Sequence, residues 1–136
     1  MRGSSFARLA AAAVVIVGIT SACRISDANA PLTPCSQPLT GITIQLQSGT
    51  PAQFEWTPEC TLGGVVIETA GVTAPGADLW IISDPKARIE GPLQYGIVPR
   101  NASEVLASTP MVSGQKYRIH LIGAAGQELY AADFTS

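Results

Sequence analysis

The fold of this chain is decided by the stretch Pro51-Ala52-Gln53-Phe54-Glu55-Trp56-Thr57-Pro58-Glu59-Cys60. Between the two prolines, apolar and polar residues alternate with a period of two. This alternation places Phe54 and Trp56 on one face and Gln53 and Glu55 on the other, as in a half-buried β-strand with water on its outer side. Two large aromatic side chains on one face need a second layer to bury them. The stretch therefore predicts a β-fold of two layers with Phe54 and Trp56 in its core.

Other short segments show the same strand-like character between turn signals, and no window after the first 22 residues has a convincing helical period. Short strands that recur every 8–12 residues are typical of an antiparallel β-sandwich. We expect an all-β domain of seven strands. Besides the stretch quoted above, the segments lie near residues 42–46, 65–68, 78–83, 89–98, 117–122 and 130–134.

The N-terminus has the features of a signal peptide. Arg2 and Arg8 are followed by an uncharged apolar run, Leu9 to Ile19, which is too short to span a bilayer stably. The run leads into Ile19-Thr20-Ser21-Ala22-Cys23, which resembles the lipobox of bacterial lipoproteins. The resemblance implies that residues 1–22 are removed, that Cys23 receives a diacylglycerol, and that the protein is anchored to a membrane by its lipid.

The chain offers an alternative cleavage site after Ala28-Asn29-Ala30, which would give a secreted protein. That cut would leave Pro31 directly after the scissile bond, where ordinary signal peptidases tolerate proline badly. The lipoprotein interpretation is therefore favoured. Arg24 follows the expected lipidated cysteine, and by analogy with enterobacterial sorting it favours the outer membrane, on either its periplasmic or its exterior side.

The three cysteines divide in a simple way. If Cys23 carries lipid, Cys35 and Cys60 remain as a pair in an oxidising compartment, which predicts a disulfide bond. Residues 23–34 are polar, contain two prolines and lack periodicity, so we expect a tether there and a folded domain at residues 35–136.

From Gly41 to Ser136, the chain resembles a fibronectin type III or related immunoglobulin-like domain. The resemblance rests on Phe54-x-Trp56 and, far downstream, on Val112-x-Gly114-x-x-Tyr117-x-Ile119-x-Leu121. It implies that Trp56 lies in the core and that the Tyr117 hydroxyl bonds to the backbone upstream of it. It also places both cysteines of the pair at one end of the sandwich. The stretch from Asp84 to Met111 is longer than the corresponding family connection, so strand assignment there stays open.

No pattern in the sequence indicates an enzyme, a cofactor or a metal site. His120 is the only histidine and is expected to face solvent, without a nucleophile placed near it by any motif. Glu55, Glu59 and Glu68 are expected on a solvated face. The formal net charge of −2, with no basic stripe, argues against nucleic acid as a partner.

The sequence favours a binding module over an enzyme. In the segment from Asp78 to Ser83, Leu79 and Ile81 are expected to face the core, which would leave Trp80 and Ile82 as an exposed apolar binding face. Two alternatives are that the stretch from Asp84 to Met111 covers them, or that Trp80 is itself in the core. The expected partner is an envelope or extracellular protein. A polysaccharide that stacks on Trp80 or Tyr95 is the alternative.

Overall fold

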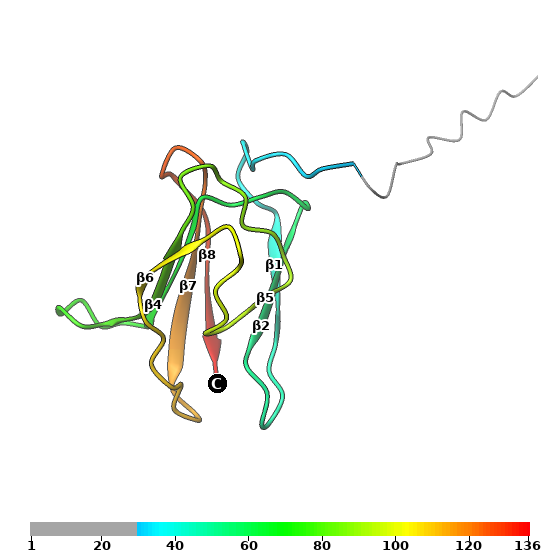
Figure 1. Ribbon diagram of the computed structural model, residues 1–136. Coiled ribbons are helices and arrows are strands. Elements are labelled where there is room, and N and C mark those ends of the chain that lie inside the picture. Colours follow the sequence, from blue (N-terminus) through cyan, green and yellow to red (C-terminus); the bar gives the residue numbers. More distant parts are fainter. Residues whose placement is uncertain (1–29) are drawn as a thin grey trace, which may run out of the picture. The chain divides into compact units, whose positions relative to one another are not determined.

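Eight β-strands form the computed structural model, which describes residues 30–136, and no helix occurs in this part of the chain (Figure 1). The predicted signal peptide, Cys23 and most of the predicted tether lie outside the described residues. The strands are β1 (Gly41–Gln45), β2 (Gln53–Thr57), β3 (Gly64–Thr69), β4 (Asp78–Ser83), β5 (Leu93–Gln94), β6 (Ser103–Leu106), β7 (Lys116–Ile122) and β8 (Glu128–Thr135).

The strands form two antiparallel sheets that make the two layers seen in Figure 1. One sheet has three strands in the order β1-β2-β5, and the other has five in the order β6-β4-β3-β7-β8. The prediction of an all-β fold with two sheets is confirmed. The described residues contain eight strands rather than the seven expected, because the stretch from Asp84 to Met111 contributes two short strands, one to each sheet.

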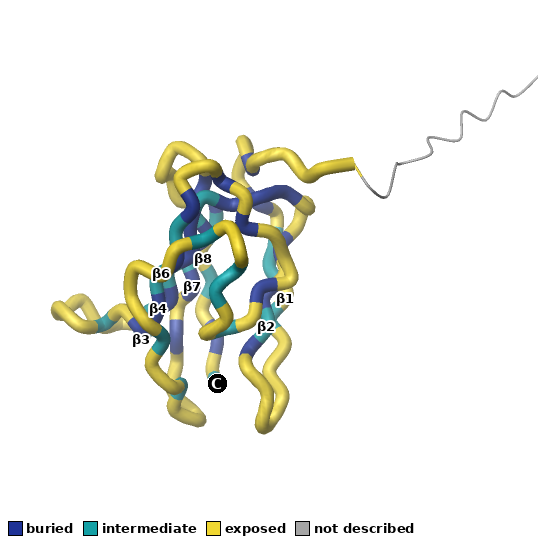
Figure 2. The backbone as a smooth tube through the Cα atoms, viewed as in Figure 1, coloured by how far each residue is buried: buried dark blue, intermediate teal, exposed yellow. Residues whose placement is uncertain are grey.

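The core lies between the sheets, where buried residues of both sheets meet (Figure 2). On β2, buried and exposed residues alternate as the sequence predicts. Phe54 and Trp56 are buried, whereas Glu55 between them is exposed. The Phe54 ring meets Phe134 of β8 edge-on, with ring centroids 5.5 Å apart. The indole N–H of Trp56 donates to the carbonyl of Cys60 at 2.8 Å, so the buried polar atom of this tryptophan has a partner.

The predicted disulfide between Cys35 and Cys60 is confirmed. It ties the segment before β1 to the connection between β2 and β3. Backbone hydrogen bonds reinforce the link, since Cys35 N–H donates to the carbonyl of Thr61 and Thr61 N–H donates to that of Thr33, both at 2.9 Å. The incoming chain is therefore fixed to the domain by one covalent bond and two hydrogen bonds.

Tyr117 begins the inward-facing row of β7 and is buried. Its hydroxyl oxygen accepts a hydrogen bond of 2.7 Å from the N–H of Val112, five residues upstream. This contact matches the one that the family resemblance implied for Tyr117. It fixes the approach of the chain to β7, because the connecting segment cannot move without breaking a partly buried hydrogen bond.

The expectation that Trp80 and Ile82 are exposed is wrong. Trp80 is 0% exposed and Ile82 is 1% exposed. They pair in register with Ile67 and Val65, whose side chains face the core. The cause is a β-bulge: Ile67 pairs with Trp80 and Glu68 pairs with Asp78, so Leu79 is an extra residue on β4. A single bulge reverses the inward and outward assignment for every residue after it.

The stretch after β4 closes the side of the sandwich over Trp80. It runs to the three-stranded sheet through β5, where Leu93 pairs with Phe54, and returns to the edge of β4 as β6. The Tyr95 ring meets Trp80 edge-on with centroids 5.3 Å apart. Glu104 on β6 accepts a hydrogen bond of 3.0 Å from the Trp80 indole N–H. Trp80 is therefore a core residue with packing and polar partners.

The turn that starts this stretch is organised by the buried carboxylate of Asp84. It accepts hydrogen bonds from the backbone N–H groups of Lys86 and Arg88, both at 3.0 Å, and from the Arg88 guanidinium at 2.9 Å. The side-chain bond from Arg88 is the largest cause that lowers the pKa of Asp84 to about 2, against the opposing effect of burial. The carboxylate therefore stays ionised and the turn stays closed over the ordinary pH range.

Candidate functional site

The outer face of the five-stranded sheet carries a continuous apolar row. In register across the sheet, Leu106 of β6 pairs with Ile81 of β4, Ile81 pairs with Val66 of β3, and Val66 pairs with His120 of β7. Leu106 is 38% exposed, and Ile81 and Val66 are half-buried. We call Leu106, Ile81 and Val66 the outer row. Three aliphatic side chains side by side on a solvent-facing sheet are a candidate surface for binding another molecule.

A shallow hollow of about 270 Å³ adjoins the outer row at the end of the sheet near the β7–β8 turn. Glycines at its floor allow the backbones to come close. A Cβ atom on Gly63 would lie 2.5 Å from the carbonyl oxygen of Gly123, and one on Gly64 would lie 3.2 Å from that of Ile82. Ile122, half-buried on β7, lines the hollow together with Val66 and Ile81 of the outer row. The apolar surface therefore extends from the outer row into a concave end.

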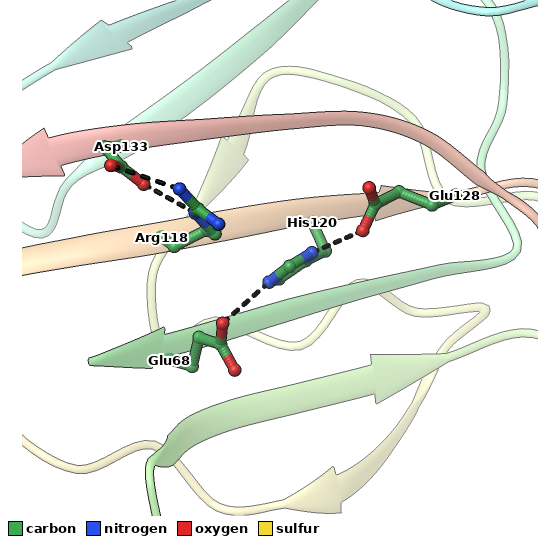
Figure 3. A network of polar contacts seen from close by, with 5 residues as sticks. All are labelled: Glu68, Arg118, His120, Glu128 and Asp133. Atoms are coloured by element: carbon green, nitrogen blue, oxygen red, sulfur yellow. Dashed lines mark hydrogen bonds and ion pairs between the residues drawn. The ribbon is translucent and has the colours of Figure 1, made fainter. Parts of the chain in front are cut away.

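Polar side chains from three strands, β3, β7 and β8, meet on the same face (Figure 3). They begin at His120, the register partner of Val66. His120 lies between two carboxylates: its Nε2 is 3.0 Å from Oε1 of Glu68 on β3, and its Nδ1 is 2.5 Å from Oε2 of Glu128 on β8. Beside them, the Arg118 guanidinium donates to Asp133 at 2.6 Å. Partial burial lowers the pKa of His120, but hydrogen bonds to Glu128 and Glu68 outweigh it and raise this pKa above the ordinary value.

This cluster does not have the geometry of a catalytic base. Both ring nitrogens of His120 already contact carboxylates, so neither is free to take a proton from a nucleophile. Of the three glutamates considered from the sequence, only Glu68 contacts His120. Glu55 and Glu59 belong to the other sheet and its following loop. Within residues 30–136, no three His, Cys, Asp or Glu side chains are placed to hold a metal ion.

A second concave region lies at the opposite end of the sandwich. It is a groove of about 790 Å³ between the β1–β2 turn and the segment that precedes β7. Tyr95 and Met111 line it with Leu46, Pro51 and hydroxyl side chains such as Ser108. The Tyr95 hydroxyl donates to the carbonyl of Thr109 at 2.5 Å. No ionisable acid or base other than Tyr95 contributes a side chain to the lining, so the groove suits an uncharged ligand.

No protein-family model, curated protein or solved structure matches this chain. Residues 30–136 contain no helix that is long and apolar enough to cross a membrane. The candidate sites are therefore defined by geometry alone.

Sequence reasoning found part of this surface. The expectation that His120 of β7 faces outward agrees with the structure. The sequence analysis wrongly expects Ile81 in the core, because the bulge on β4 has no recognisable sequence pattern. It does not place Leu106 on the outer face, because the strands between Asp84 and Met111 are left unassigned. The only available signal was Val105-Leu106, a short apolar pair within a polar stretch.

Proposed function

We propose that this chain is a non-enzymatic, lipid-anchored protein of the bacterial envelope, in which an immunoglobulin-like domain binds another protein. The proposal that the domain binds a protein is supported by the outer row of Leu106, Ile81 and Val66, which three adjacent strands align on one exposed face. Flat apolar faces of this kind suit a protein partner better than a small molecule, because they bury area without enclosing a ligand.

The arrangement of strands supports the immunoglobulin-like part of the proposal. β1, β2 and β5 share one sheet, whereas β4, β3, β7 and β8 are neighbours in the other. In immunoglobulin-like sandwiches too, the first, second and fifth strands of the family share one sheet. In the constant type the fourth strand joins that sheet, whereas here β4 pairs with β3. The strand β6, which pairs with the edge of β4, is a further departure from the constant-type pattern.

Partner binding is tested by capture from an envelope extract with matched variants. Leu106→Glu places a charge on the outer row, and Val72→Glu places the same charge on the β3–β4 turn, where Val72 is 42% exposed and Leu106 is 38% exposed. Burying an unpaired carboxylate against an apolar partner is costly. We expect Leu106→Glu to reduce capture of a specific partner by about tenfold or more, and Val72→Glu to leave it unchanged. Equal capture by both variants would contradict the proposed surface.

The lipid anchor is supported by Ile19-Thr20-Ser21-Ala22-Cys23 and by the disulfide, which fits an oxidising compartment. We expect mass spectrometry of the membrane fraction to find a chain that starts at a lipidated Cys23. A Cys23→Ser variant should leave that fraction, because acyl chains contribute about 0.8 kcal/mol per buried methylene. An unmodified start at Pro31 would instead support the alternative, a secreted protein.

A carbohydrate-binding accessory module is the second candidate function, and the groove at Tyr95 is the observation that favours it. An uncharged lining with hydroxyl groups and one aromatic ring suits a neutral sugar. Trp80 cannot serve as the sugar platform considered from the sequence, because it is buried. The test is retention of the domain on immobilised polysaccharides. If Leu46→Glu abolishes the retention and Leu106→Glu preserves it, carbohydrate binding is favoured over protein binding.

A further inference from the structure

The two carboxylate contacts of the His120 ring favour one of its protonation states. Each ring nitrogen lies within hydrogen-bond distance of a carboxylate oxygen, Nδ1 of Glu128 and Nε2 of Glu68. An ionised carboxylate can accept a hydrogen bond but cannot donate one. With both carboxylates ionised, the two contacts are satisfied together when both ring nitrogens carry hydrogen, that is, when the ring is an imidazolium.

When the His120 ring loses one proton, it can donate a hydrogen bond to only one of the two carboxylates. A neutral imidazole has one N–H group and one bare nitrogen, and the bare nitrogen would point its lone pair at the lone pairs of a carboxylate. We propose that His120 is a proton-dependent clamp that, as an imidazolium, ties Glu68 of β3 to Glu128 of β8 across the outer face and releases one of them when it loses its proton. The clamp joins three strands, because His120 itself stands on β7.

The charged groups around His120 favour its protonated form. The two carboxylates that touch it raise the pKa of His120 and together outweigh the lowering effect of burial. On β7, Arg118 is paired with Asp133 of β8, so its positive charge is locally compensated. The remaining charged side chains of the neighbouring strands are Asp78, which is the register partner of Glu68 on β4, and Lys116 at the start of β7.

The direction of the pH effect follows from this pKa. Because the folded-state pKa of His120 is raised, the clamp contributes its full stabilisation below the ordinary histidine pKa of about 6.5 and loses it as pH rises through the folded-state value. The clamp does not depend on the proposed binding function. If the outer face does bind a partner, as proposed above, deprotonation of His120 removes one positive charge beside the outer row, and the affinity then varies with pH.

The clamp is tested by a proton NMR titration of the imidazole ring, together with the ¹⁵N shifts of both ring nitrogens. The chain contains one histidine, so the signals need no assignment. We expect titration above pH 6.5 and two protonated ring nitrogens below the midpoint. Glu68→Gln and Glu128→Gln should each shift the midpoint to lower pH. Glu55→Gln, which removes the same charge from the other sheet, should leave the midpoint unchanged.

A second measurement covers the case in which a glutamate variant fails to fold. The free energy of unfolding of the native sequence should fall as the pH rises through the midpoint of the titration, whereas His120→Gln should lack this decline. A midpoint at or below 6.5, or the same pH profile for both proteins, would overturn the clamp. Neither measurement requires the binding partner, so either result can be separated from a failure of the proposed function.

Discussion

Replacing Trp80 with alanine is expected to destabilise the domain by about 3–5 kcal/mol, the range for a large aromatic side chain removed from a packed core. Trp80 is fully buried, meets the Tyr95 ring edge-on and donates to Glu104. Its removal leaves a cavity beneath the stretch that closes the sandwich. Urea denaturation of the purified protein, followed by circular dichroism, measures the loss.

Trp80→Phe is the matched control for this experiment. It keeps an aromatic ring in the core but removes the indole N–H that Glu104 accepts, so a smaller loss than for alanine is expected. If Trp80→Ala costs less than about 1 kcal/mol, Trp80 is not a core residue. The exposed binding face expected from the sequence would then have to be reconsidered.

Removing the disulfide through the double variant Cys35→Ala/Cys60→Ala is expected to cost about 3 kcal/mol. The two cysteines are 25 residues apart, and the bond restricts this loop in the unfolded chain. Thermal or urea unfolding measures the difference. Changing both cysteines avoids the reactive thiol that a single substitution would leave unpaired.

Reduction supplies an independent control for the disulfide. A thiol reductant should lower the stability of the native sequence to that of the double variant and should not affect the double variant itself. If the two substitutions leave the free energy of unfolding unchanged, the bond does not stabilise the domain. The anchoring of the N-terminal segment would then depend on backbone hydrogen bonds such as those that Thr61 makes with Cys35 and Thr33.

Features that rest on local pattern were predicted well. The alternation around Phe54 and Trp56 was sufficient to place both side chains inward, because a strand with one apolar face has only one way to bury it. The disulfide followed from counting, because two cysteines remain once Cys23 is assigned to lipid. Both inferences need only neighbouring residues or composition.

Features that depend on pairing between distant strands could not be predicted. The bulge at Leu79 is set by how β4 pairs with β3, and the segment from Asp78 to Ser83 is apolar enough on both faces to allow either register. The His120 cluster joins residues 52 positions apart, Glu68 and His120, which only the sheet order brings together. Composition and periodicity do not contain this information.

In-cell photo-crosslinking can show whether a protein partner contacts the outer face of the five-stranded sheet. A photoreactive amino acid would replace Ile81, at the centre of the outer row, or Val72, on the exposed β3–β4 turn as control. We expect a discrete crosslinked product from position 81, which disappears when Leu106→Glu is added, and none from position 72. A product from position 72 alone, or one from position 81 that Leu106→Glu leaves intact, would show that the outer row is not the surface that binds the partner.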